Sequence, residues 1–228
     1  MSDRPGQTIV LWGAREGVGT TIAAIQLAFQ HPNDVTLIDL GGNLDITLGL
    51  GKSPDGVLEL RHPLNRTTDE ILAAATVQIT PGVALVPHGG RDQNDALGDG
   101  PLADLAEWIR THQGVVIVDA GTGPPPEALA EVADDSIAVT RLTLIDAYRL
   151  RWNRTQPTGV IVVDHPDAWL TTADIETAAG ESIHARMPND LNTSHAIDTG
   201  SRGATNGQLR ARAGEGPGYA GLSVERWN

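Results

Sequence analysis

Residues 13–21 read Gly13-Ala14-Arg15-Glu16-Gly17-Val18-Gly19-Thr20-Thr21, and they lie between the apolar run Thr8–Trp12 and the helically spaced segment Thr20–Gln30. A glycine-rich loop between a strand and a helix is typical of a phosphate-binding loop, in which backbone N–H groups and the helix dipole face an anion. The hydroxyl of Thr21 is placed to reach a Mg²⁺ ion. An ordinary strand-to-helix turn can contain the same glycines, so the loop alone is a weak signal.

Short apolar runs bounded by turn-forming residues alternate along the chain with segments of helical spacing. The runs are continuous rather than alternating, which is typical of strands buried on both faces of a sheet. Strands alternating with helices predict an α/β fold with a doubly wound, mainly parallel sheet flanked by helices. The predicted strands are Thr8–Trp12, Val35–Asp39, Val83–Val86, Val115–Asp119, Ser136–Thr140 and Gly159–Val163. The predicted helices are Thr20–Gln30, Thr68–Ala75, Pro101–His112, Pro126–Val132, Thr143–Trp152, Thr172–Ala179 and Asp190–Ile197.

Two of the predicted strands end in an aspartate, Asp39 and Asp119. Four apolar residues followed by Asp119 form the Walker-B arrangement, in which the carboxylate holds the water shell of a metal ion. Together with the Thr21 hydroxyl, the two carboxylates are the candidate ligands of Mg²⁺.

The loop and the two acidic strands, in this order, resemble the ParA/MinD superfamily of deviant-Walker P-loop ATPases. The segment Met187-Pro188-Asn189-Asp190 is similar to the Ile-Pro-x-Asp segment of that superfamily. The resemblance covers about residues 7 to 199. Within the superfamily, the chain resembles the CpaE/TadZ-like proteins, which act beside secretion and pilus ATPases or in polar placement and often have eroded P-loops.

The resemblance assigns nucleotide contacts to the loop, but the charges of this loop differ from those of the superfamily. Arg15 replaces the signature lysine that reaches across the dimer, Glu16 adds a carboxylate, and Thr20 replaces the phosphate-binding lysine. We expect Arg15 to meet a carboxylate of the facing subunit. The loop residues to which the resemblance assigns nucleotide contacts are Arg15, Gly17, Val18, Gly19, Thr20 and Thr21.

Two further positions depart from the superfamily pattern. Gly41 stands where the superfamily has the carboxylate that positions the attacking water, and Asp164 stands where an asparagine usually reads adenine. An ionised Asp164 accepts hydrogen bonds but cannot donate them. Phosphoryl transfer is catalysed mainly by positioning and by stabilising charge. No residue is therefore assigned a catalytic role, and we expect ATP or ADP with Mg²⁺ to bind weakly or not at all.

The resemblance implies a non-catalytic positioning or scaffold protein, a pseudo-ATPase acting in pilus or secretion assembly or in septum or pole placement. The alternative is an active ATP-dependent switch in which Arg15 or a partner replaces the lysine. A transferase of the dethiobiotin-synthetase kind shares the fold, but it needs a lysine-bearing loop, and the only lysine is Lys52. The implied partners are proteins of the secretion, pilus or division machinery, and a homodimer is one option.

Composition restricts the partners and the compartment. Sixteen Lys+Arg against 29 Asp+Glu give a net charge of −13, which disfavours binding to nucleic acid and to anionic membranes. No cysteine is present, so disulfides and thiolate chemistry are excluded. The polar N-terminal segment and the lack of a long apolar segment predict a cytoplasmic protein without direct membrane insertion. We expect one domain over residues 1–199 and a flexible glycine-rich C-terminal tail over residues 200–228.

Overall fold

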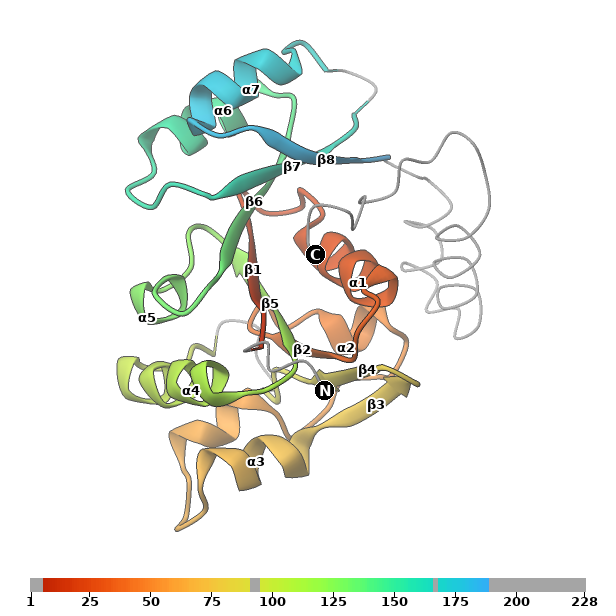
Figure 1. The fold of residues 1–228 in the computed structure, drawn as a ribbon, viewed down its shortest axis with the longest axis vertical. Helices are drawn as coiled ribbons and strands as arrows, with labels where there is room; N and C mark the ends of the chain where they lie inside the picture. The colour runs from red at the N-terminus through yellow and green to blue at the C-terminus, as the bar shows by residue number, and fades with distance from the viewer. Residues whose placement is uncertain (1–5, 91–94, 166–167, 189–228) are drawn as a thin grey trace.

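The computed structural model describes residues 6–90, 95–165 and 168–188, which form one eight-stranded sheet flanked by helices (Figure 1). The strand order is β3-β4-β2-β5-β1-β6-β7-β8, and all neighbours are parallel except β3 and β4. The predicted α/β fold class, with a doubly wound and mainly parallel sheet, is confirmed. The strands are β1 Thr8–Gly13, β2 Val35–Asp39, β3 Val77–Thr80, β4 Val83–Val86, β5 Val115–Thr122, β6 Asp135–Arg141, β7 Gly159–Val163 and β8 Ile183–Met187.

The connections between strands contain α-helices and one 3₁₀ helix, η1. Their bounds are α1 Thr20–Gln30, α2 Leu44–Thr47, η1 Val57–Arg61, α3 Thr68–Ala75, α4 Asp99–Thr111, α5 Glu127–Ala130, α6 Leu144–Trp152 and α7 Thr172–Ala179. Among the described helices, none is both long and apolar enough to cross a membrane.

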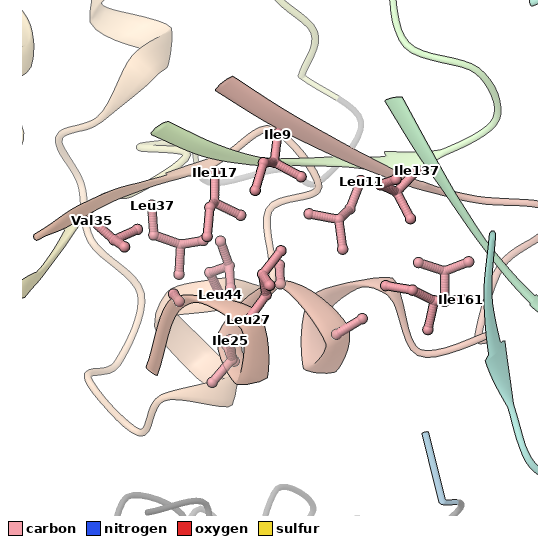
Figure 2. Close-up of a cluster of buried hydrophobic side chains, with 14 of the residues drawn as sticks. Ile9, Leu11, Ile25, Leu27, Val35, Leu37, Leu44, Ile117, Ile137 and Ile161 are labelled. Atoms are coloured by element: carbon pink, nitrogen blue, oxygen red, sulfur yellow. The ribbon is translucent and has the colours of Figure 1, made fainter. Parts of the chain in front are cut away.

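One face of the sheet packs against α1 and α2. Alternate residues of the central strands, such as Ile9, Leu11 and Ile117, point to this face and meet Ile25 and Leu27 of α1 (Figure 2). All of these side chains are buried. Because successive strand residues point to opposite faces, this packing fixes which residues of β1 face the helices on the other side.

The opposite face of the sheet carries two neighbouring clusters. Val10 of β1 packs with residues of α3 and α4, and Trp12 of β1 packs with Ala147 and Leu150 of α6 and with residues of α7. Every residue of β1 is buried, because both faces of this central strand are covered. This buried strand β1 leads directly into the glycine-rich loop, so packing on both sides of the sheet holds the start of the loop in place.

The two edge strands of the sheet, β3 and β8, were not predicted from the sequence. β3 is short and half exposed, and β8 reads Ile-His-Ala-Arg-Met, so neither forms the continuous apolar run of a strand buried on both faces. The short helices α2 and η1 were also missed, because a helix of one turn shows no periodicity. The predicted helix Asp190–Ile197 and the predicted tail over residues 200–228 lie outside the described residues.

Candidate functional site

The glycine-rich loop and the two acidic strand ends meet at one edge of the sheet. β5 lies between β1 and β2, and all three strands are parallel, so their carboxyl ends share that edge. Asp39 and Asp119 are direct neighbours in the register of β2 and β5. The tertiary structure therefore brings together Thr21, Asp39 and Asp119, which are far apart in the sequence.

The loop backbone has the conformation of an anion cradle. Gly17 and Gly19 have φ angles of 71° and 104°, a left-handed region that residues with side chains rarely adopt. Gly19 is the N-cap of α1, and no side chain caps this helix. The first N–H groups of α1 are thus available to an anion, and the helix dipole favours negative charge there.

Thr20 and Thr21 begin α1 with different surroundings. Thr20 is buried, and its Oγ1 atom lies 2.6 Å from where a Cβ on Gly13 would be, so a side chain at Gly13 would collide with it. The Thr21 hydroxyl donates a 2.7 Å hydrogen bond to Oδ2 of Asp119. Thr20 therefore places a small, uncharged and buried side chain at the loop position that the resemblance assigns to a phosphate-binding lysine.

Asp39 and Asp119 form a buried acidic pair. Asp39 accepts hydrogen bonds from the backbone N–H groups of Gly42 at 2.7 Å and Leu44 at 2.9 Å, and Asp119 accepts one from Gly121 at 3.0 Å. Burial, followed by the charge of Asp119, raises the pKa of Asp39 to about 7. Burial also raises the pKa of Asp119. A divalent cation would stabilise the ionised form of both groups, so the pair and Thr21 fit Mg²⁺.

Gly41 lies directly against this acidic pair. A Cβ at Gly41 would be 3.5 Å from both carboxylate oxygens of Asp119 and 3.3 Å from the Cα of Gly121. A carboxylate at this position would therefore add a third negative charge close to Asp119. The structure has backbone there instead, and no side chain at this position can orient a water molecule.

Arg15 pairs with a carboxylate of the same chain. Its Nε atom donates a 2.7 Å hydrogen bond to Oδ1 of Asp146, a carboxylate on α6 that is fully buried. The other oxygen of Asp146 accepts from the backbone N–H of Arg141 at 3.2 Å. Asp146 was not predicted from the sequence as a site residue. Its spacing from Thr143 is nevertheless that of a helix cap, and the Thr143 side chain accepts a hydrogen bond from the backbone N–H of Asp146.

Two more arginines reach the loop from the same side. Arg141, at the end of β6, donates through Nη2 to the carbonyl oxygen of Gly17, and Arg149 of α6 donates to that of Ala14 at 3.4 Å. Burial, and next the charge of Arg15, lower the pKa of the Arg141 guanidinium. The loop that lacks a lysine therefore has three guanidinium groups in or beside it, and two of them, those of Arg141 and Arg149, were not predicted from the sequence.

Asp164 follows β7 and lies at the same edge of the sheet. Arg186 of β8 donates to Oδ1 of Asp164 through both Nε, at 3.0 Å, and Nη2. Both side chains are partly exposed. The position that the resemblance assigns to adenine recognition is thus occupied by an ion pair, and Arg186 offers further donors beside it.

The loop positions and the metal candidates form one site, with Asp164 at the end of β7, which β6 separates from β1. Within the described part of the chain, no group of three or more histidine, aspartate or glutamate side chains is placed to hold a metal ion. The candidate Mg²⁺ ligands are two carboxylates and a hydroxyl, so a cation here needs further ligands, such as water or phosphate oxygens.

Several solved structures have a fold similar to that of this chain. A ParA family ATPase from Chlorobium tepidum is similar with a TM-score of 0.73 and 18% identity, over 92% of this chain and 96% of that chain. The MinD cell division protein of Aquifex aeolicus is similar with a TM-score of 0.66 and 20% identity, over 92% and 98%. The septum site-determining protein MinD of Pyrococcus horikoshii, solved with Mg-ADP, is similar with a TM-score of 0.57 and 14% identity, over 91% and 94%.

The chain therefore has the fold of the ParA/MinD P-loop NTPases, as the resemblance implied. No protein-family model matches the sequence, and no curated protein is similar to it in sequence. Because the identities to the solved structures are 20% or lower, the likeness shows the fold alone.

Proposed function

We propose that this chain is a member of the ParA/MinD superfamily, similar to the CpaE/TadZ-like proteins, and works as a cytoplasmic positioning or scaffold protein that hydrolyses little ATP. The fold, the left-handed glycines of the loop and the Thr21–Asp119 hydrogen bond support descent from a nucleotide-binding site. Protein partners and a homodimer belong to the same proposal.

The charge at the loop carries this proposal. Thr20 is buried and neutral, Glu16 is exposed beside the loop, and Arg15 is engaged by Asp146. Gly41 provides no side chain to orient water. Phosphoryl transfer depends on positioned cations and on an oriented nucleophile. A loop without its lysine and without a side chain to orient water can keep the fold, but we expect it to hydrolyse little ATP.

A second candidate function is an active ATP-dependent switch, and one observation favours it. Arg15, Arg141 and Arg149 all border the loop, so positive charge is present although the lysine is absent. In this case a rearrangement of the Arg15–Asp146 pair would redirect one guanidinium to phosphate. The two candidates differ in the affinity for nucleotide and in the rate of phosphate release.

Isothermal titration of the full chain with Mg-ATP and Mg-ADP tests the proposal, together with a phosphate-release assay. We expect dissociation constants weaker than about 100 μM and no release above the buffer rate, since a site without its cations binds phosphate poorly. A low-micromolar dissociation constant with steady turnover would establish the switch ATPase and overturn the pseudo-ATPase proposal.

Light scattering addresses the dimer. The expectation that Arg15 meets a carboxylate of the facing subunit requires Arg15 to leave Asp146, with which it pairs in its own subunit. We expect a nucleotide-free dimer at tens of micromolar that Arg15→Glu weakens, and the Lys52→Glu variant serves as a charge-matched control. A monomer under these conditions, or a dimer that Arg15→Glu leaves unchanged, would reject this role for Arg15.

A further inference from the structure

Helix α6 presents an apolar strip to solvent. Leu144, Tyr148 and Trp152 follow one another every four residues and are 76%, 62% and 69% exposed, with Ile145 beside them at 52%. Residues four apart on a helix share a face, so these side chains form one continuous surface. The rings of Tyr148 and Trp152 lie 6.1 Å apart.

A fifth exposed apolar residue lies in another segment, which is hydrogen-bonded to the chain just before α6. Trp169 is 93% exposed, and the backbone N–H of its neighbour Leu170 donates a 3.5 Å hydrogen bond to Leu142, just before α6. We call Leu144, Ile145, Tyr148, Trp152 and Trp169 the α6 strip. Single exposed apolar residues are ordinary, but a contiguous group of large ones marks an interaction surface. Figure 1 shows α6 beside α7 at one end of the sheet.

The charge of α6 and of the residues just after it is opposite to that of the chain as a whole. Arg149, Arg151 and Arg154 are exposed along and just beyond α6, whereas the one acidic residue between 141 and 154, Asp146, is buried. The chain carries a net charge of −13. Neither Arg151 nor Arg154 forms an ion pair with any residue that the structure describes. Arg151 and Arg154 therefore remain available to acidic groups of a partner.

We propose that the α6 strip docks an acidic, amphipathic helix of a protein partner. A ridge of side chains spaced by four residues fits the groove of a second helix, whose apolar face would cover Tyr148 and Trp152. Glutamates or aspartates flanking that face would pair with Arg151 and Arg154. This inference goes beyond the proposed nucleotide site and does not depend on nucleotide binding.

The same features disfavour the other occupants. In a two-fold contact between two copies, the arginines of one α6 would face those of the other, because a two-fold interface pairs a surface with itself. The side chains of Leu144 and Ile145 are aliphatic, so they can neither stack on nucleobases nor form hydrogen bonds with them. The overall negative charge repels nucleic acid and anionic lipid surfaces at long range, whereas a short acidic peptide carries much less charge against that field.

Fluorescence anisotropy of the full chain with designed peptides tests the proposal. The probe is a fluorescein-labelled amphipathic peptide of about 20 residues, with leucine at helical spacing and glutamate on the flanks, and the matched probe has lysine for glutamate. We expect the glutamate peptide to bind at least about tenfold more tightly. Tyr148→Ser with Trp152→Ser, and separately Arg151→Glu with Arg154→Glu, should each weaken it by about tenfold or more.

Controls separate docking from other effects. Leu64→Ser replaces an exposed leucine elsewhere, and Arg110→Gln replaces an arginine of α4, so both should leave peptide binding unchanged. The thermal midpoint and the Mg-ATP affinity of the strip variants should match those of the parent. The comparison of peptide affinities therefore stays valid even if the parent and all variants bind nucleotide weakly.

Three outcomes would overturn the proposal. One is equal affinity for the two peptides, or no binding of either. Another is binding to phosphatidylglycerol vesicles or to single-stranded DNA that the strip variants abolish. The last is a shift in the monomer–dimer balance caused by the strip variants, which would make a second copy the occupant.

Discussion

The arginines at the loop act on the peptide carbonyls of the loop and leave its N–H groups open. Arg141 donates to the carbonyl oxygen of Gly17, and Arg149 donates to that of Ala14. In a trans peptide the C=O and the following N–H point in opposite directions, so a guanidinium that holds the Gly17 carbonyl directs the Val18 N–H away from itself. Arg141 thus restrains the loop through its Gly17 carbonyl and does not cover the N–H group to which the proposed function assigns an anion.

Restoring charge in the loop should restore binding. We expect Glu16→Gly with Thr20→Lys to lower the dissociation constant for Mg-ATP by about tenfold or more, because it removes a carboxylate and adds a cation at the phosphate position. Calorimetric titration measures the change. Glu131→Gly, at the exposed end of α5, is the matched control for loss of an acid. No gain in the double variant would contradict the placement of Thr20 at the phosphate site.

The role of Arg141 can be measured in that charge-restored background, where binding is strong enough to titrate. Arg141→Gln should weaken Mg-ATP binding by about threefold to tenfold, because the Gly17 carbonyl loses its charged donor and the loop is less well ordered. Arg151→Gln, an arginine of α6 that does not touch the loop, should leave binding unchanged. Equal effects of the two changes would mean that only general charge matters.

The buried acidic pair makes the stability of the chain depend on pH. The pKa of Asp39 is raised from 3.8 to about 7, so between these values the folded chain holds a proton that the unfolded chain has released. The free energy of unfolding contributed by this group therefore falls as the pH rises through that range, and it stays low above the folded pKa.

The Asp119→Asn substitution should reduce the decrease in the free energy of unfolding as the pH rises. An asparagine can accept from Gly121 and donate to the Thr21 hydroxyl, so both hydrogen bonds persist while one buried charge disappears. Urea unfolding at pH 5 and pH 8 should show the variant more stable than the parent at pH 8 by about 1 kcal/mol or more, since one pKa unit corresponds to about 1.4 kcal/mol. Identical pH slopes for the two proteins would refute the assignment.

At the scale of elements, the edge pair β7 and β8 depends on one glycine. A Cβ at Gly159 of β7 would lie 1.7 Å from Nδ1 of His184 on β8, so any side chain there must displace the imidazole ring. The His184 ring therefore leaves no room for a side chain at Gly159. Two residues beyond His184 on β8, Arg186 pairs with Asp164, which follows β7.

Gly159→Ala should lower the free energy of unfolding by about 1–3 kcal/mol, as overpacking of a filled site does. The double variant Gly159→Ala with His184→Ala should recover most of this loss, because the smaller side chain leaves room for the methyl group. Gly100→Ala is the control, since open space surrounds that position within α4 and alanine favours helix. Thermal and urea unfolding measure all three, and a double variant as unstable as the single one would exclude the clash.

At the scale of the whole molecule, the α/β domain is expected to fold without the last residues of the chain. Residues 200–228 are rich in glycine and show no helical period, which predicts little burial of apolar surface. Truncation after Thr199 should therefore change the thermal midpoint by no more than about 2 °C. A drop of many degrees in differential scanning calorimetry would mean that this segment packs on the domain.

Much of the central sheet could be predicted from local sequence, and the edges could not. β1, β2, β5 and β7 are continuous apolar runs because helices cover them on both faces, and this pattern is visible without a structure. β3 and β8 contain both polar and apolar residues because a sheet edge is partly exposed. A search for continuous apolar runs therefore does not detect them. Their existence depends on pairing with β4 and β7.

The candidate site divides in the same way. The sequence alone predicted the glycine-rich loop, Thr21, Asp39 and Asp119 as candidate residues. It also indicated that Thr20 and Gly41 lack the charged groups that the resemblance would place there, because these features follow from residue type and position in a motif. Only the tertiary structure decided that Arg15 pairs with Asp146, that Arg141 and Arg149 reach the loop, and that Arg186 engages Asp164. These pairs join residues distant in sequence, and long side chains choose partners by the packing of strands and helices, which no local spacing encodes.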